Sequence, residues 1–367
     1  AQGWPGGDLI GALARRENAF AVALHASGKL GAAYVPLDPD YPEQRLSHIM
    51  RDANLRLIIG QGTAPFALDE EQRWVNLGCG EVQAQLDAQS PSAPPIRHDP
   101  QRLAQVIYTS GSTGLPKGVM VEPGSLANLL LDHGRRLGVA PGDRMLDCMS
   151  LSFDAGNMCA LVPLVHGACL LWADPGEGLL DEIARTETTH MIFATALLPT
   201  LPERRLPAMK AVGFGGEACP PAIPQRWAKQ FRLIDMYGPT ETTVTALTKT
   251  LTPDERLTIG APIDGMQAVV LDRHGALCPV GVPGELCLAG LGLARGYLNQ
   301  PERTAEAFRE HTVAGVKVRL YHTGDRARLL STGDYEYLGR LDAQIKLRGY
   351  RIEPGEIEAQ LHASCSS

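Results

Sequence analysis

Short apolar runs and amphipathic stretches alternate along the first sixty residues. The apolar runs Gly7–Leu13, Ala32–Leu37 and Leu55–Ile59 predict strands. Between them, Glu17–Leu30 and Arg45–Asp52 have the spacing and flanking residues of helices. Strands that alternate with helices in this way are typical of doubly wound α/β structure with a parallel sheet.

The pattern of apolar and polar residues changes twice in the rest of the chain. The polar, proline-bearing segment 61–100 predicts an irregular connection over the surface. Beyond it, apolar runs recur with helical segments between several of them, and each run predicts another strand of α/β structure. These runs are Leu103–Tyr108, Met145–Met149, Ala168–Trp172, His190–Ala194, Ala211–Phe214 and Leu233–Met236. After Thr250, runs that alternate with glycine and proline turns predict a small β-rich subdomain. They are Ala268–Leu271, Gly284–Leu288 and Val316–Tyr321.

Length and charge narrow the classes of protein that fit. A chain of 367 residues exceeds the usual limit for one hydrophobic core, so more than one subdomain is expected. A hydrophobic content of 44% and a charged content of 20% are those of a soluble globular protein. The net charge of −7 gives no support for nucleic-acid binding, and no cluster of lysine or arginine indicates a membrane surface. No apolar run is long enough to span a membrane, and no signal-peptide pattern opens the chain.

The eight cysteines are scattered, without a C-x-x-C pair or a Cys/His spacing typical of metal ligands. Most lie in or beside apolar runs, where a cysteine usually behaves as a small buried hydrophobe. These are Cys148, Cys159, Cys169, Cys219, Cys278 and Cys287. We therefore expect reduced thiols and a cytoplasmic location.

The stretch Tyr108–Val119, which follows a predicted strand, is the strongest candidate for ligand binding. It places three glycines and four hydroxyl residues around Lys117. Glycines let backbone N–H groups approach an anion, and the hydroxyls and the lysine add donors and positive charge. Its spacing is not the Walker pattern, because a proline precedes the lysine and no Ser or Thr follows it. The loop suits a polyphosphate, and the plain alternative is a polar hairpin or linker.

The sequence Tyr-Thr-Ser-Gly-Ser-Thr-Gly-Leu-Pro-Lys-Gly-Val of this loop resembles the phosphate-binding signature of the adenylate-forming superfamily. That superfamily holds acyl-CoA synthetases, luciferases and the adenylation domains of nonribosomal peptide synthetases. Lys29–Pro42 and Leu293–Thr304 resemble the early and late motifs of the peptide synthetase branch, where we interpret them as structural. The resemblance implies a luciferase-like core of two doubly wound α/β subdomains and a small β-rich, distorted-barrel subdomain.

The same resemblance predicts the domain boundaries. Residues 1–340 would form the large adenylation core, and 341–367 the hinge and the beginning of a C-terminal lid. The lysine with which the family's lid closes the site would lie beyond Ser367, so most of the lid would be missing. A strand and a helix would also precede Gly7, so both ends are expected to be cuts through a longer protein. Such a chain is expected to catalyse adenylation only weakly on its own.

Tyr237–Thr243 follows a buried strand and carries an aromatic residue, a Gly-Pro turn and an acid. A ring at a strand end can stack on a base, and a carboxylate can hold Mg²⁺ with phosphate oxygens. The resemblance implies that Tyr237 packs against adenine, Thr240 touches the phosphate and Glu241 ligates the metal. Gly215–Ala218 resembles the other side of the adenine pocket, although a Gly-Gly pair alone is more often a simple turn.

Tyr321–Asp325 places an acid after a strand, where a carboxylate can accept ribose hydroxyls. A lone aspartate would more often be a solvated turn or a helix cap. By resemblance Asp325 binds the ribose, Arg340 reaches the same sugar, and Asp342 is the hinge of a rotating lid.

The resemblance thus assigns two overlapping sets of residues to ATP. The catalytic set is Lys117, Thr240, Glu241 and Arg340, with Glu241 also the metal ligand. The nucleotide-binding set is Thr109, Ser110, Gly111, Ser112, Thr113, Gly114, Gly215, Gly216, Glu217, Tyr237, Gly238, Asp325 and Arg340.

Asp154 decides the branch of the superfamily. An acid beside an apolar pocket is what an α-ammonium group needs, because a desolvated charge requires a partner. The alternative is a helix N-cap on the following apolar run. By resemblance the substrate pocket is formed by Phe153, Asp154, Ala155, Met158, Phe193, Gly213, Gly215, Met236, Val244 and Thr245. This mostly apolar wall favours an aliphatic amino acid, valine first and isoleucine or leucine next. One methylene changes selectivity by only about 1–3 kcal/mol, so the choice among them stays open.

The implied activity is attack of the amino acid carboxylate on the α-phosphorus of ATP·Mg²⁺, with release of pyrophosphate. The aminoacyl adenylate would then pass to the phosphopantetheine thiol of a peptidyl carrier protein. The resemblance leaves open whether a small MbtH-like activator also binds. Two alternatives remain: an acyl-CoA synthetase, which Asp154 argues against, and a nucleotide-binding module without turnover, which Lys117, Glu241 and Asp325 argue against.

Overall fold

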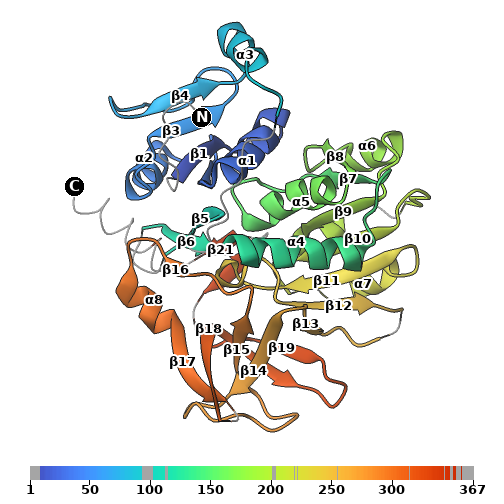
Figure 1. Ribbon diagram of the computed structural model, residues 1–367. Coiled ribbons are helices and arrows are strands. Elements are labelled where there is room, and N and C mark those ends of the chain that lie inside the picture. The colour runs from blue at the N-terminus through green and yellow to red at the C-terminus, as the bar shows by residue number, and fades with distance from the viewer. Residues whose placement is uncertain are drawn as a thin grey trace.

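The computed structural model describes residues 9–92, 102–111, 115–200, 204–218, 220, 222–253, 255–313, 315–342, 344–347, 350–352 and 357. Two seven-stranded sheets, A and B, and a five-stranded antiparallel sheet, C, make up most of this part of the chain. In Figure 1 the strands β1–β4 of sheet A lie at the top, sheet B at the right and sheet C at the bottom. The predicted division into two α/β parts and one β-rich part is confirmed.

Sheet A has the order β16-β6-β5-β2-β1-β3-β4. Its strands are β1 (Leu9–Leu13), β2 (Ala33–Leu37), β3 (Leu57–Gly60), β4 (Arg73–Asn76), β5 (Gln105–Thr109), β6 (Lys117–Val121) and β16 (Gly296–Tyr297). Its helices are α1 (Asn18–Leu30), α2 (Glu43–Asp52) and α3 (Gly80–Asp87). The strands β1 to β5 run parallel, whereas β6 pairs antiparallel with β5 and joins Thr109 to Lys117 in register. The candidate phosphate loop therefore connects two antiparallel neighbours.

The prediction that residues 61–100 are irregular is wrong for two stretches of that segment. Strand β4 pairs in parallel with β3, and helix α3 follows it. The reason is that β4 is a four-residue edge strand with polar ends, and α3 buries none of its residues. Neither element has the apolar periodicity from which a strand or helix is predicted.

Sheet B has the order β13-β12-β11-β10-β9-β7-β8, in which the five strands β7 to β11 run parallel and the other two antiparallel. Its strands are β7 (Arg144–Asp147), β8 (Cys169–Trp172), β9 (His190–Ala194), β10 (Ala211–Gly215), β11 (Arg232–Tyr237), β12 (Leu247–Leu251) and β13 (Ala261–Pro262). Its helices are α4 (Pro123–Leu137), α5 (Asp154–Val165), α6 (Leu179–Arg185) and α7 (Ala222–Trp227), with 3₁₀ turns η1 (Thr195–Thr200) and η2 (Thr240–Thr242). Helices α4 and α5 pack against each other across the face of this sheet in Figure 1.

Sheet C has the order β14-β15-β18-β17, and β19 also pairs with β18. Its strands are β14 (Met266–Leu271), β15 (Gly284–Gly290), β17 (Phe308–Val313), β18 (Val316–Leu329) and β19 (Tyr335–Arg340), with α8 (Pro301–Ala307) before β17. After β19, β20 (Ile345–Leu347) and β21 (Tyr350–Ile352) pair only with each other. The long strand β18 carries the predicted ribose-binding acid.

The cysteines follow the burial prediction only in part. All six cysteines that the structure describes are free thiols, and Cys148, Cys159 and Cys287 are buried as predicted. The burial prediction is wrong for Cys169, which is exposed because β8 is the edge strand of sheet B. Cys278 is half-buried, and Cys219 lies outside the described residues.

The helices are short. The longest in the described part of the chain is α4, with 15 residues. None of the described helices combines the length and the apolar character needed to cross a membrane.

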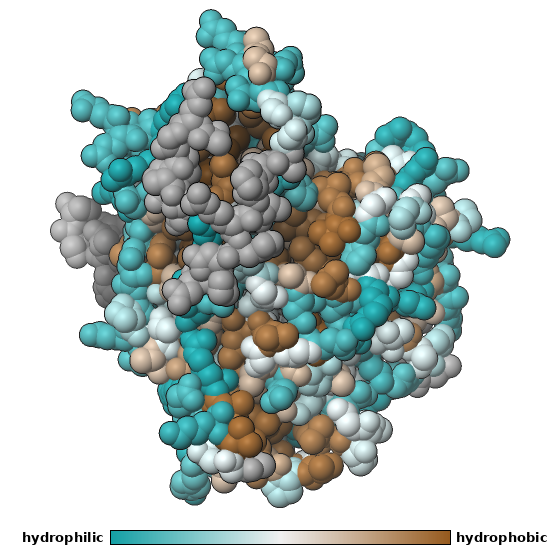
Figure 2. All heavy atoms as spheres, in the orientation of Figure 1, coloured by the Kyte–Doolittle hydropathy of each residue, from teal (hydrophilic) through white to brown (hydrophobic). Residues whose placement is uncertain are grey.

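The three sheets converge at the carboxyl ends of several parallel strands. Strands β5, β9, β10 and β11 all end at the edge of one pocket. Figure 2 shows apolar residues gathered where the lobe of β1–β4 meets the region of α5. The fold thus brings loops from distant parts of the sequence to one place, where open α/β sheets bind ligands.

Candidate functional site

A pocket of about 1310 Å³ lies where the three sheets meet. Thr109 and Ser110 enter it at the end of β5, and Gly215 and Gly216 at the end of β10. Turn η2 contributes Thr240 after strand β11. Hydroxyl residues and glycines from three strand ends therefore line one cavity, a composition suited to an anionic ligand.

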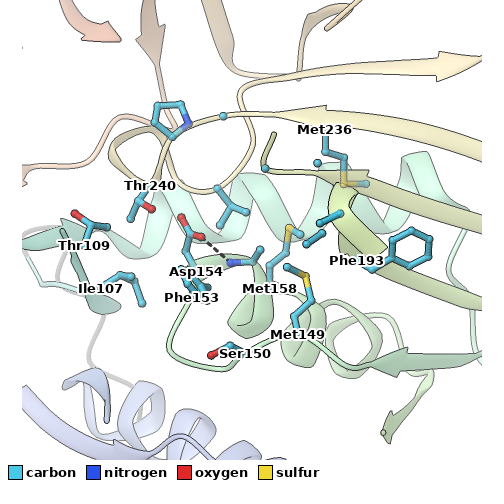
Figure 3. Close-up of a pocket in the computed structure, with 18 of the residues that line it drawn as sticks. Ile107, Thr109, Met149, Ser150, Phe153, Asp154, Met158, Phe193, Met236 and Thr240 are labelled. Carbon is cyan, nitrogen blue, oxygen red and sulfur yellow. Dashed lines mark hydrogen bonds between the residues drawn. The ribbon is translucent and has the colours of Figure 1, made fainter. Parts of the chain in front are cut away.

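Asp154 lies at the boundary between two halves of this pocket. Figure 3 shows its carboxylate between the hydroxyl residues Thr109 and Thr240 and the side chains around Met158. It is the first residue of α5, after Phe153 at the N-cap, and its Oδ1 accepts the backbone N–H of Ala155 at 2.7 Å. Burial raises the pKa of Asp154, and a hydrogen bond from Thr240 opposes that shift. The acid is thus held at a helix start but also faces the cavity.

Sulfur and aromatic side chains make the apolar half of the pocket. Met158, Phe193 and Met236 come from α5, β9 and β11 and lie on the same side of Asp154 in Figure 3. Gly213 lies beneath them, since a Cβ there would come within 2.5 Å of Met236 Cε. The thioether of Met236 therefore fills the space above this glycine and shortens the pocket.

Val244 forms part of the wall in a strained backbone conformation. Its φ is 67°, and the N–H of Thr245 bonds the carbonyl of Thr243 across it at 2.8 Å. Such a γ-turn with positive φ is rare and strained, especially at a β-branched residue. The Thr243 hydroxyl, bonded to the Gly292 carbonyl at 2.7 Å, fixes the turn. The surrounding structure thus imposes the position of this wall residue.

Lys117 and Glu241 form a buried ion pair beside the pocket. Lys117 Nζ lies 3.0 Å from Glu241 Oε1 and 3.0 Å from the Tyr297 hydroxyl, which itself donates to Glu241 Oε1 at 2.8 Å. The ammonium also lies 4.2 Å from the centre of the Tyr297 ring. Glu241 is 0% exposed. One lysine, one acid and one phenol from three distant segments therefore form a single polar cluster.

Asp325 connects the aromatic turn to the end of sheet C. The Tyr237 hydroxyl donates to its carboxylate, and Arg340 Nη1 lies 2.9 Å from its other oxygen. Arg340 Nε in turn bonds Asp342 Oδ1 at 2.8 Å. Burial and the Asp325 carboxylate raise the pKa of Tyr237, so its hydroxyl stays a donor. The four residues form one continuous chain of contacts.

The structure brings most predicted residues to this one pocket. Of the predicted substrate residues, nine line it and Gly213 lies behind Met236. Of the predicted nucleotide and catalytic residues, those that line it are Thr109, Ser110, Gly215, Gly216, Gly238, Thr240, Asp325 and Arg340. Tyr237 contacts the lining residue Asp325, and Glu241, which pairs with Lys117, follows the lining residue Thr240 in turn η2. Gly111 and Glu217 are not among the lining residues. Ser112, Thr113 and Gly114 lie outside the described residues.

Sequence reasoning missed several residues of the site. Ile107, Met149 and Thr323 line the pocket, and Tyr297 contacts both members of the buried ion pair. Tyr297 belongs to the late motif, which we interpret as structural, and its hydroxyl contacts two predicted catalytic residues, Lys117 and Glu241. The signal available was a tyrosine inside a motif, but only the pairing of β16 with β6 places it beside Lys117.

Asp147, at the end of β7 below the pocket, gives a pH-dependent prediction. It is fully buried, its Oδ1 accepts the Met149 N–H at 2.9 Å, and its Oδ2 has no hydrogen-bond partner in the described structure. Burial raises its pKa from 3.8 to about 7. The contribution of the neutral acid to the free energy of unfolding is fully present below the ordinary pKa of 3.8. This contribution is lost as the pH rises through the raised pKa of about 7. Between these two pKa values the free energy of unfolding of the wild-type protein should fall by up to about 1.4 kcal/mol per pH unit because of Asp147. Asp147→Asn should remove this pH dependence.

The measurement is urea unfolding of both proteins below and above pH 7. The variant is expected to be the more stable of the two above pH 7, where wild-type Asp147 is charged and desolvated. Parallel pH profiles of the two proteins would contradict this assignment. Asp87→Asn, on the exposed surface of α3, is the matched control and should leave the profile unchanged.

Glu241 fits a magnesium ion by its donor type. Mg²⁺ is usually held by one or two carboxylates together with phosphate oxygens of the substrate and water. Glu241 offers one carboxylate beside the hydroxyl-lined half of the pocket, next to Thr240. An ion held there would neutralise negative charge on phosphate oxygens.

Comparison with known proteins agrees with this geometry. Residues 1–298 match the family model described as AMP-binding enzyme. Bacitracin synthase 3 of Bacillus licheniformis is 38% identical over 359 residues, covering 96% of this chain and 6% of that protein. Tyrocidine synthase 2 of Brevibacillus parabrevis is 36% identical over 363 residues, covering 96% of this chain and 10% of that protein. The chain thus spans only a small fraction of these relatives.

Solved structures give the same result. PA1221, a nonribosomal peptide synthetase protein containing adenylation and PCP domains, matches with a TM-score of 0.86 and 27% identity over 97% of this chain and 63% of its own. The four-domain nonribosomal peptide synthetase AB3403, bound to AMP and glycine, matches with a TM-score of 0.81 and 30% identity over 97% of this chain and 27% of its own. The chain therefore belongs to the family of AMP-binding enzymes, and the relatives and solved structures described above, which it resembles, are peptide synthetases.

Proposed function

We propose that this chain activates an aliphatic L-amino acid, with valine favoured, as its aminoacyl adenylate. The observation that carries the proposal is Asp154, a carboxylate between the hydroxyl half and the apolar half of one pocket (Figure 3). An amino acid whose ammonium group pairs with Asp154 has its side chain toward Met236 and its carboxylate toward Thr240. ATP occupies the remainder of the pocket, where Asp325 and Arg340 are within reach of its ribose.

The reaction joins a carboxylate oxygen of the amino acid to the α-phosphorus of ATP. The bond from that phosphorus to the bridging oxygen breaks, and pyrophosphate leaves. The protein's part is to hold the two reactants in line and to stabilise the charge that develops. Ser110 and Thr240 supply hydroxyl donors at the cavity surface, and Lys117 supplies a positive charge beside them. Mg²⁺, held by Glu241, adds electrostatic stabilisation of phosphate oxygens when bound.

The adenylate then passes to the phosphopantetheine thiol of a peptidyl carrier protein. This partner is proposed because the matched PA1221 contains adenylation and PCP domains in one protein. We place the hinge of a mobile lid at Asp342, where residues 341–367 would begin that lid after the core of residues 1–340. Support comes from the position of Asp342 after β19 and its ion pair with Arg340. A cytoplasmic location and an MbtH-like activator stay predictions.

The choice of valine rests on the length of the apolar half. The Met236 thioether occupies the space over Gly213, and the Met236 backbone carbonyl occupies the space over Gly215. Val244 limits the cavity on another side. A short branched side chain fits such a space, and no charged group besides Asp154 lies among the predicted substrate residues.

The test is amino-acid-dependent ATP–pyrophosphate exchange with all common amino acids, together with binding of the matching aminoacyl-sulfamoyl adenosines by calorimetry. Valine, isoleucine or leucine should give the highest exchange and the tightest binding. Highest exchange with threonine, aspartate or glutamate would overturn the pocket interpretation. Preference for a carboxylic acid without an amino group would support an acyl-CoA synthetase instead.

Met236→Ala is expected to move the preference toward longer side chains. Removing the thioether opens the space above Gly213, so leucine should gain on valine by about 10- to 200-fold in the ratio of kcat/KM. The measurement is pyrophosphate exchange with leucine and with valine in separate assays. Met50→Ala, which removes a buried methionine of α2 outside the pocket lining, is the control and should keep the ratio. An unchanged ratio in Met236→Ala would contradict the proposed role of its side chain.

A further inference from the structure

A second group of ligand-type side chains lies in sheet C, and none of its members is among the residues assigned to ATP and the amino acid. Glu285 and Cys287 are on β15, His322 is on β18 and His311 is on β17. Cys287 and His322 are direct partners across the two strands. Strand pairing therefore gathers a carboxylate, a thiol and two imidazoles from segments that are far apart in the sequence.

Three of these side chains already have the separations of metal ligands. Cys287 Sγ lies 3.6 Å from His322 Nδ1, and the same nitrogen lies 2.9 Å from Glu285 Oε2. All three donor atoms fall within 4.8 Å of one another. Tetrahedral zinc with its usual bond lengths separates sulfur and nitrogen by about 3.6 Å, and nitrogen and oxygen by about 3.4 Å. Of the two printed separations, the one between Glu285 and His322 has to open by about 0.5 Å to admit an ion.

The second imidazole has the geometry of an orienting partner. His311 Nε2 lies 3.0 Å from His322 Nε2, on the side of the ring opposite the three-ligand cluster. Histidines that bind metals through one ring nitrogen usually donate the other N–H to a neighbouring acceptor, which fixes the tautomer. His311 can accept that proton, so His322 Nδ1 is left with a lone pair toward Cys287 and Glu285.

We propose that Glu285, Cys287 and His322 form a binding site for a single divalent transition-metal ion, with Zn²⁺ as its natural occupant. A thiolate, an imidazole and one carboxylate form the mixed ligand set typical of this borderline ion, whereas Mg²⁺ and Ca²⁺ prefer oxygen ligands alone. On binding, the Cys287 thiol releases its proton to solvent and a metal–sulfur bond forms. Water takes the fourth position, since His322 and Glu285 are partly exposed while Cys287 is buried.

The site adjoins the nucleotide pocket through one residue. The other oxygen of Glu285, Oε1, accepts the backbone N–H of Gly324 at 3.1 Å. Gly324 has a φ of 69° and directly precedes the ribose-binding candidate Asp325. A metal ion that fixes Glu285 therefore also fixes the turn that presents Asp325. The plain alternative is an ion pair between Glu285 and His322 beside an ordinary core cysteine.

The test is titration of the EDTA-treated chain with Co²⁺, followed by displacement with Zn²⁺. We expect one Co²⁺ per chain, a thiolate-to-cobalt charge-transfer band in the near ultraviolet, and loss of that band when Zn²⁺ is added. Cys287→Ser should abolish the band. The matched control, Cys278→Ser, changes a half-buried cysteine of the same subdomain and should keep it. His311→Ala should weaken binding by about 10- to 100-fold without removing the band.

His322→Gln keeps the test decisive if Cys287→Ser does not fold, because it changes a partly exposed ligand and should also lose Co²⁺. Circular dichroism confirms the fold of each variant. Absence of a charge-transfer band in the wild-type chain would overturn the proposal. So would a band that persists in Cys287→Ser, or one that disappears equally in Cys278→Ser.

Discussion

Replacing Asp154 by asparagine is expected to lower kcat/KM for the preferred amino acid by about two to three and a half orders of magnitude. The change leaves the α-ammonium group in the pocket without its carboxylate, and breaking a desolvated ion pair by removing one partner costs about 3–5 kcal/mol. Each 1.4 kcal/mol corresponds to about tenfold in rate. The measurement is pyrophosphate exchange, together with calorimetric binding of valyl-sulfamoyl adenosine.

The decisive comparison uses the same acid without its amino group. For 3-methylbutanoate, which lacks the ammonium of valine, Asp154→Asn should leave the activity unchanged or raise it. An equal loss for valine and 3-methylbutanoate would mean that Asp154 acts only by supporting the start of α5. Asp87→Asn, an exposed change on α3, controls for the loss of a negative charge.

Replacing Glu241 by glutamine is expected to destabilise the fold by about 3–5 kcal/mol, besides removing activity. The Lys117 ammonium would stay buried beside Tyr297 without the carboxylate that now lies 3.0 Å away. Urea unfolding measures this loss. The double variant, which combines Glu241→Gln with Lys117→Met, removes both charges and should recover part of the lost free energy of unfolding. The free energies of the single and double variants together give the coupling energy of the pair.

A partly exposed pair provides the matched control. Glu255 lies 2.6 Å from Lys249, and both side chains retain contact with solvent. Glu255→Gln should therefore cost no more than about 1 kcal/mol. A cost for Glu241→Gln that does not exceed this value would contradict the view of Lys117 and Glu241 as a desolvated, mutually dependent pair.

Hydrophobic periodicity predicts the fold well where strands are buried. The parallel strands β9, β10 and β11 are mostly apolar and mostly buried, and their positions follow from the sequence to within one residue. Elements at sheet edges could not be predicted in the same way. Strand β4 and helix α3 bury little apolar surface, and the exposure of Cys169 depends on β8 having one neighbour. Whether a strand lies at the edge of a sheet depends on the order of the strands in that sheet. The local pattern of apolar and polar residues does not encode this order.

The candidate site shows the same limit. Motifs at strand ends predict which residues approach the pocket, because loops after parallel strands meet at one edge of a sheet. Contacts between motifs depend on register and could not be predicted. Tyr297 reaches Lys117 only through the pairing of β16 with β6, and His322 reaches Cys287 only across β15 and β18. The absence of any Cys/His ligand spacing in the sequence therefore does not exclude the cluster in sheet C.

The γ-turn at Val244 bears on how the size of the pocket could change during evolution. Here the backbone and the side chain favour different residues: positive φ favours glycine, whereas the wall of the pocket needs bulk. A mutation to glycine would relax the main chain while enlarging the chamber beside it. A single substitution at this position could thus let a descendant accept a bulkier building block.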